Sequence, residues 1–238
     1  MAIEFGSLSL RNDANLQEYY KLENVTAEVT TPGNDLTNNG TATFVAAKFN
    51  NGVSGGSSDA DKTLSIASAL GLTNGSYGIS FWAKVLTAPS SVTYNFLELF
   101  ETTTDISLLV EYVDTAGTKT VVFHRVKVGV ADEVASFAID LGIADLHHFV
   151  ITYNGTTIKG YIDNIERASF AASGNGSSAT ATKFCIMGGR TDNTSNNFLG
   201  IVDDVALFNR NLTAADVDLI YNGPAVTDED TGGVFLLS

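Results

Sequence analysis

The chain has 238 residues, of which 44% are hydrophobic, and it carries a formal net charge of −14 at pH 7. This length and hydrophobic content allow one domain with a buried core and exclude a disordered tail. An acidic chain repels phosphate backbones and anionic lipid head groups, so we expect neither nucleic acid binding nor membrane insertion. No apolar run reaches the roughly 18 residues that a membrane-spanning helix needs.

Alternation of apolar and polar residues runs through much of the chain and predicts β-strands. In residues 77–85, one face of the predicted strand carries four apolar residues, Ile79, Phe81, Ala83 and Val85. Further strands are predicted over residues 106–113, 118–128, 148–153, 156–162, 165–170, 183–188 and 198–209. The single cysteine, Cys185, lies in one of them, where we expect a small buried hydrophobe rather than a nucleophile.

Two tight turns are predicted between these strands. Asn154 and Gly155 separate two of them and favour a hairpin with a type I′ turn, because Asn and Gly accept positive φ angles. Asp163 and Asn164 form the second turn, which leads into residues 165–170.

One short helix is predicted near the end of the chain. Thr213 can cap its start, and Asp216, three positions later, completes a capping box. Val217 and Ile220 then face inward. Strands throughout with one late helix indicate an all-β fold, a two-sheet antiparallel β-sandwich with one short C-terminal helix.

We divide the chain into a sandwich domain, residues 1–226, and a polar linker with an apolar terminal segment, residues 227–238. Residues 3–10 alternate cleanly and residues 234–237 are apolar, so both ends could complete a neighbouring molecule's sheet by strand addition. Self-association through these terminal strands is therefore one expectation. The alternative is that both ends pair within their own domain.

Several stretches resemble known sequence signatures. Residues 146–155 together with 159–164 resemble the paired strands of the concanavalin A-like, laminin-G-like superfamily, although Leu146 stands where that family usually has tryptophan. Residues 198–213 resemble its closing strand and the start of its helix. Shorter matches to its opening segment and an inner strand lie in residues 19–22, 36–41, 45–49 and 79–82. The matches extend from about Leu16 to Gly223 in the family's order, and they imply a concanavalin A-like jelly roll.

Most members of that superfamily are binding modules, such as lectins and the carbohydrate-binding modules of glycosidases. The resemblance therefore implies a non-catalytic carbohydrate-binding or adhesion domain of a secreted, cell-surface or phage protein, with a glycan or surface polysaccharide as its partner. The alternative is a structural subunit of an extracellular or virion assembly, joined by terminal strand addition. Both place the protein outside the cell, at a cell surface or on a virion. Fold alone does not decide between them.

Some members of the superfamily are glycoside hydrolases, which need two carboxylates facing one cleft, roughly 5 Å apart in retaining enzymes. The nearest sequence to that family's catalytic pattern contains Glu98 and Glu101, with Phe100 at the place of the middle aspartate. In a regular strand these two glutamates point to opposite faces. We therefore expect no enzymatic activity and no catalytic residue.

The resemblance also implies one structural calcium ion, held between the opening loop and an aspartate of the closing strand. Asp203 matches that aspartate, and Asp204 follows it. The opening loop offers further oxygen ligands of the kind that Ca²⁺ prefers, from Glu28, Asn34 and Asp35. That loop is one residue longer than the family's and has Glu28 for its aspartate. The alternative is that Asp203 and Asp204 cap loops through hydrogen bonds.

Sugar binding needs aromatic rings that stack on sugar faces and polar groups that fix hydroxyls. Candidate rings are those of Trp82, Tyr94 and Tyr112. Candidate polar groups lie in the loop of residues 190–197, at Arg190, Asp192, Asn193 and Asn196. The alternative is that the aromatic residues belong to the core, as large aromatics in a sandwich commonly do.

Overall fold

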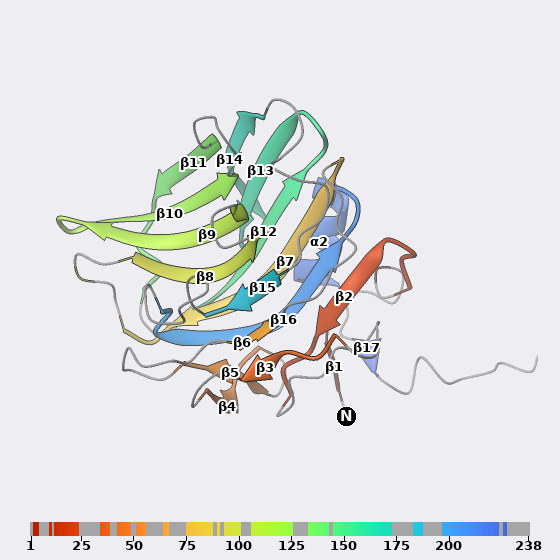
Figure 1. The fold of residues 1–238 in the computed structure, drawn as a ribbon, viewed down its shortest axis with the longest axis horizontal. Coiled ribbons are helices and arrows are strands. Elements are labelled where there is room, and N and C mark those ends of the chain that lie inside the picture. The colour runs from red at the N-terminus through yellow and green to blue at the C-terminus, as the bar shows by residue number, and fades with distance from the viewer. Residues whose placement is uncertain are drawn as a thin grey trace, which may run out of the picture.

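The computed structural model describes residues 2–4, 10, 12–23, 34–38, 42–48, 51–55, 64–66, 75–87, 90, 93–100, 106–125, 133–142, 145–172, 183–187, 197–223 and 226–227. Two large antiparallel sheets pack face to face, as Figure 1 shows. This confirms the predicted all-β sandwich with one short late helix. Among the described residues, no helix is long and apolar enough to span a membrane.

The eight-stranded sheet contains the strands that the alternation pattern predicted best. Its order is β14 (Ile165–Ala171), β13 (Thr157–Ile162), β12 (Leu146–Tyr153), β7 (Tyr77–Val85), β16 (Gly200–Phe208), β5 (Asn51–Ser54) and β4 (Thr43–Ala46). A further strand, β2 (Leu16–Tyr20), pairs with β16. β7 has the predicted bounds and lies between β12 and β16. Its inward face packs in the interior core, and on its outward face Trp82 stacks on Tyr221 of the helix α2 (Ala214–Asn222).

The seven-stranded sheet has the order β11 (Glu133–Ala138), β10 (Thr118–Arg125), β9 (Ile106–Thr115), β8 (Thr93–Phe100), β15 (Lys183–Ile186), β6 (Leu64–Ile66) and β3 (Thr37–Asn38). Its edge strand β11 lies against β14, the edge strand of the other sheet, so the two sheets meet along this side. Cys185 lies in β15, as the alternation predicted.

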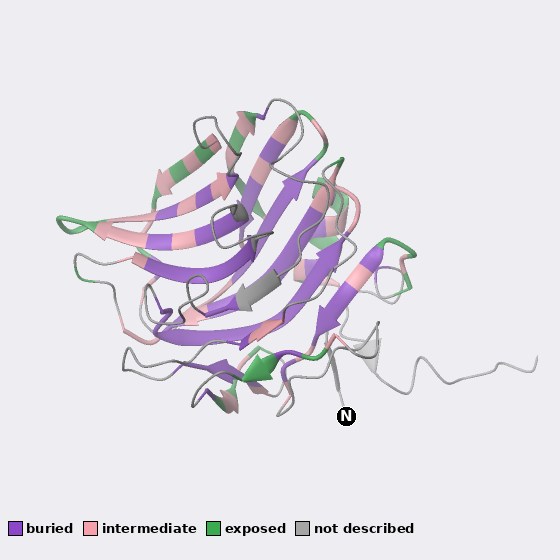
Figure 2. Cartoon of the chain, viewed as in Figure 1, coloured by how far each residue is buried: buried purple, intermediate pink, exposed green. Residues whose placement is uncertain are grey.

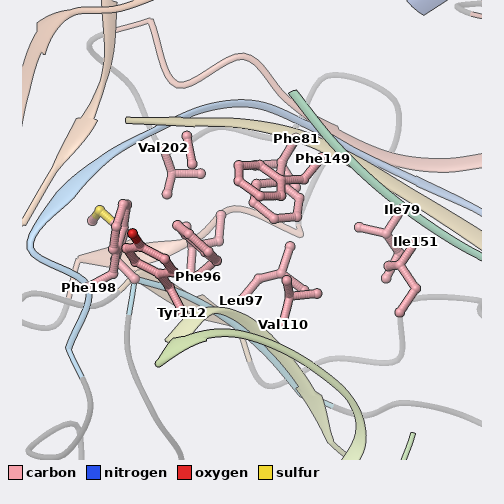
Figure 3. Packing of buried hydrophobic residues seen from close by; sticks show 14 of the residues in the cluster. Ile79, Phe81, Phe96, Leu97, Val110, Tyr112, Phe149, Ile151, Phe198 and Val202 are labelled. Atoms are coloured by element: carbon pink, nitrogen blue, oxygen red, sulfur yellow. The ribbon is translucent and has the colours of Figure 1, made fainter. Parts of the chain in front are cut away.

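The interior between the sheets is rich in aromatic rings (Figure 3). Phe81 of β7 and Phe149 of β12 stack with centroids 5.1 Å apart, and Phe96 of β8 meets Phe149 from the opposite sheet at 4.9 Å. Burial of side chains this large dominates the stability of a core. At one point the sheets come so close that only glycine fits, because a Cβ atom on Gly160 would lie 2.4 Å from the ring of Phe123.

The helix α2 (Ala214–Asn222) covers the outer face of the eight-stranded sheet. The predicted capping box is present, with Thr213 accepting from the N–H of Asp216 and the Asp216 carboxylate accepting from the N–H of Thr213. Val217 and Ile220 are buried, as predicted. They join a second apolar cluster with Tyr19 and Phe208, separate from the interior core.

The turns follow the sequence only in part. Asp163 and Asn164 both have positive φ, which confirms the second tight turn. The turn after β12 is a hairpin, but the predicted type I′ geometry is wrong, because only Gly155 has positive φ. Asn154 instead accepts hydrogen bonds through its side-chain oxygen from the N–H groups of Thr156 and Thr157. The side chain of Asn154 thus shapes a longer loop.

The start of the chain pairs within the same molecule. β1 (Ala2–Glu4) pairs antiparallel with β17 (Val226–Thr227), which lies at the predicted domain boundary. The N-terminal segment thus pairs within its own chain, which is one of the two alternatives that the sequence left open. The apolar residues 234–237 lie outside the described residues.

Candidate functional site

The outward face of the seven-stranded sheet carries an unexpected group of polar residues. Cross-strand register places Glu98 opposite Leu109, and Leu109 opposite His124, so these three side chains form one row across β8, β9 and β10. In the next row Asn95 lies opposite Glu111. Because residues paired in register share a face, all the polar members of both rows point away from the interior.

A bulge in β8 brings Glu98 and Asn95 onto this face. The register shifts between Asn95 and Leu97, and Phe96 and Leu97 both enter the interior cluster (Figure 3). One extra residue on the bulged strand reverses the alternation beyond it. Glu98 therefore faces outward three residues after Asn95.

His124 and Glu111 form a close pair on this face. The Nε2 atom of His124 lies 2.6 Å from an Oε atom of Glu111. The side chains are only 20% and 14% exposed, so the pair is largely shielded but still reachable from solvent. A carboxylate oxygen and an imidazole edge at such a place can both hydrogen-bond a ligand.

Asn95 contributes an unused acceptor. The residue is 3% exposed, and its side-chain oxygen has no hydrogen-bond partner in the part of the chain that the structure describes. Its backbone forms an isolated parallel bridge with Asn197. A buried polar atom without a partner costs free energy, so such an atom is a signal of an absent water or ligand.

Exposure rises across this face from β8 to β11 (Figure 2). Glu98 and Asn95 on β8 are buried, whereas Val134 on β11 is 46% exposed. We call the set of Asn95, Glu98, Glu111, His124 and Asn197 the polar face. It has buried hydrogen-bonding groups at one end and an open, aliphatic edge at the other.

The Concanavalin A-like lectin/glucanases superfamily matches residues 26–218 of the chain. The chain belongs to this superfamily. The match spans most of the sandwich, including every strand of the polar face. No curated protein matches the chain.

Solved structures with the concanavalin A-like fold align over most of the chain at low identity. One comes from a study of botulinum neurotoxin type C, whose cell entry depends on interaction with two ganglioside molecules. It aligns with a TM-score of 0.70 and 16% sequence identity, and the alignment covers 91% of this chain and 52% of that chain. Another is domain 4 of an extracellular arabinanase from Geobacillus stearothermophilus in complex with arabinotriose. It aligns with a TM-score of 0.60 and 16% sequence identity, and the alignment covers 87% of this chain and 98% of that domain. The chain therefore spans about half the length of the neurotoxin structure and nearly all of the arabinanase domain. At these identities the likeness shows the shared fold.

Two of the aromatic candidates for sugar stacking lie in the interior. Tyr94 and Tyr112 are 5% and 1% exposed and belong to the cluster between the sheets, so their prediction as a stacking surface is wrong. Trp82 lies on the outer face of the other sheet, where it stacks on Tyr221 of α2 with centroids 5.6 Å apart. With Lys48 over its ring and 3% exposure, it too offers no stacking surface.

The polar candidates belong to the predicted loop of residues 190–197. Arg190, Asp192, Asn193 and Asn196 are outside the described residues. The last residue of that loop, Asn197, is described, and its backbone is bridged to Asn95. The four polar candidates stay predictions.

The predicted calcium ligands are only partly described, and Glu28 lies outside the described residues. Asp203 and Asp204 are buried in a bulge of β16, where Asp204 accepts a hydrogen bond from the hydroxyl of Tyr19. The amide of Asn34 donates to Glu18, and Asp35 is exposed. Among the described residues, no three His, Cys, Asp or Glu side chains gather as a metal site. Glu28 and the rest of residues 24–33 lie outside the described residues, so the calcium site stays a prediction.

Sequence reasoning missed Asn95, Glu111 and the register of Glu98. The alternation pattern relates only the carboxylates within one strand, whereas Glu98 and Glu111 lie on one face of two neighbouring strands. A bulge and a cross-strand register leave no mark in a single strand's alternation. The one available signal was the proximity of Glu98 to two adjacent interior residues, Phe96 and Leu97.

Proposed function

We propose that this protein is a non-catalytic carbohydrate-binding domain whose polar face binds a glycan. The observation that carries the proposal is the outward, largely buried group of hydrogen-bonding side chains around the oxygen of Asn95, which has no partner among the described residues. Sugar hydroxyls both donate and accept, which suits a surface of carboxylate, imidazole and amide groups. The superfamily membership and the arabinotriose-bound arabinanase domain support this class of ligand.

The chemistry of the face suggests how the ligand is held. The described outward side chains of β10 and β11 include the aliphatic groups of Val122 and Val134. Recognition in this proposal rests on hydrogen bonds to the hydroxyl edge of a sugar from the carboxylate, imidazole and amide groups of the polar face. Glu111 and His124 fix hydroxyls near the open side, and Asn95 accepts from one that reaches deeper.

The same proposal places the protein outside the cell, at a cell surface or on a virion, where glycans are displayed. A role in adhesion or in targeting a larger protein follows from binding without catalysis. The alternative of assembly by strand addition is less well supported, because β1 already pairs with β17 of the same chain.

The test is a glycan array followed by calorimetric titration of the best ligand. We expect Glu111→Gln to weaken binding at least tenfold, because a charge-assisted hydrogen bond contributes about 1.5–3 kcal/mol. Asp218→Asn, an exposed carboxylate on α2, is the matched control and should bind as the wild type does. Equal affinity in Glu111→Gln would refute the polar face as the site.

A hydrolysis assay on the same ligand separates binding from catalysis. We expect intact ligand after prolonged incubation. Release of reducing ends that Glu98→Gln abolishes would instead make Glu98 and Glu111 a catalytic pair and overturn the non-catalytic proposal.

A further inference from the structure

A hollow of about 230 Å³ lies on the outer face of the eight-stranded sheet, on the opposite side of the sandwich from the polar face. Its floor comes from β12 and β13, where Thr152 and Lys159 are direct cross-strand partners. Its wall is the segment of residues 211–214, which leads into α2. All nine lining residues are described. We call this hollow the α2 pocket.

The α2 pocket is preformed, because its wall is fixed to its floor. The N–H of Leu212 donates to the hydroxyl of Thr152 over 2.7 Å, and this bond is buried. Leu212 can lie this low because residue 78 is glycine, where a Cβ atom would come 2.5 Å from the Leu212 side chain. Because the pocket is already ordered before a ligand binds, no binding free energy is lost in ordering it.

Several polar groups of the pocket have no hydrogen-bond partner among the described residues. Asn154 spends its side-chain oxygen on the N–H groups of Thr156 and Thr157, which leaves the amide N–H₂ as a donor. In the described chain, the hydroxyl of Thr157 and the side-chain amide of Asn211 have no hydrogen-bond partner. These three groups can donate and accept around one small ligand.

The charges of the α2 pocket balance. The ammonium of Lys159 lies 2.9 Å from the carboxylate of Glu166, and both side chains are about two-fifths exposed. The paired lysine therefore gives little attraction for an anion. The apolar lining comes from Leu212, Tyr161 and Ala214. Neutral polar groups beside a small apolar lining suit a polyhydroxylated ring.

We propose that the α2 pocket is a second binding site, which takes one neutral sugar unit. This inference rests on the proposed function only for its ligand class, because the pocket shares no residue with the polar face. A domain with sites on both sides of the sandwich can hold two chains of a polysaccharide, or two points of one surface. Such bivalence raises the overall avidity without new contacts at either site.

The experiment uses neutral trisaccharides of arabinose, galactose, glucose and N-acetylglucosamine as probes. Amide chemical shifts of the labelled chain are followed during each titration. We expect at least one probe to shift amides of residues 154–159 and 211–214. The double variant Thr157→Val/Asn211→Ala should raise the Kd of that titration about thirtyfold, since two lost hydrogen bonds of about 1 kcal/mol each sum to about 2 kcal/mol.

The matched control is Thr115→Val/Asn222→Ala, which makes the same chemical changes at exposed positions away from the pocket. It should titrate as the wild type does. Shifts confined to β8–β11 would overturn the second site and leave the proposed function standing. Shifts confined to the α2 pocket would support the second site and refute the polar face. A wild-type response in the double variant, or no shift with any probe, would overturn the second site.

Discussion

The Nε2 atom of His148 lies 2.8 Å from the hydroxyl oxygen of Ser80, and both residues are fully buried beneath α2. The other ring nitrogen, Nδ1, has no hydrogen-bond partner among the described residues. Trp82 and Tyr221 pack around the ring, with centroids 4.8 and 5.9 Å from it. The imidazole is thus held as a neutral group in a dry site between sheet and helix.

Acid should destabilise the fold through His148. Burial lowers its pKa to about 3 from 6.5, and this outweighs the opposing effect of Asp163. In the unfolded chain the imidazole of residue 148 therefore binds a proton below about pH 6.5, whereas in the folded chain it binds one only near pH 3. Stability should fall by up to about 1.4 kcal/mol per pH unit in that window. Urea denaturation of wild type and His148→Gln between pH 7 and 4 checks this, with a shallower fall expected in the variant. Parallel curves would contradict it.

His147 should act in the opposite direction. Its hydrogen bond to Asp163, with Nδ1 2.6 Å from the carboxylate, raises its pKa above the ordinary value. The stabilisation is complete below the unfolded pKa of about 6.5 and is lost as the pH rises through the folded pKa. Asp163→Asn keeps the left-handed turn that residue 163 requires. An NMR titration should show the pKa of His147 above 6.5 in the wild type and lower in this variant. An unchanged value would show that Asp163 is not the cause.

Gly160→Ala should destabilise the protein by about 1–3 kcal/mol, the usual cost of overpacking a core. The added methyl group meets the ring of Phe123 from the opposite sheet at 2.4 Å. Phe123→Leu in the same chain should recover part of the loss, and a double-mutant cycle by chemical denaturation measures that coupling. Strict additivity of the two changes would show that the sheets have room to separate.

Calcium bound at the predicted site should raise the melting temperature as a structural ion, without acting as a catalyst. A ligand that binds only the folded state adds about 2.7 kcal/mol at a hundredfold excess over its Kd. Melts with calcium and with a chelator measure the difference. Asp35→Asn tests the predicted ligand set at an exposed position, where the substitution should not unfold the chain. Identical melts in all conditions would remove the calcium prediction.

Local patterns of the sequence determined much of this protein. The alternation of Ile79, Phe81 and Ala83 predicted β7 to the residue, and Thr213 with Asp216 predicted the start of α2. These features depend on neighbours in the chain, whose spacing sets which side chains share a face and which N–H groups need a cap. The order of the matched stretches likewise identified the superfamily.

Only the tertiary structure shows the geometry of the two proposed sites. Glu98 and Glu111 share a face because β8 contains a bulge and pairs with β9 in one register, and a slip of one residue would separate them. The α2 pocket exists because Leu212 approaches Gly78 across 134 positions of sequence (212 minus 78). Tyr94 and Tyr112, by contrast, lie in the core, where their large rings help to fill the space between the two sheets. Register and packing between distant segments follow from the free energy of the whole fold, which no single stretch of sequence encodes.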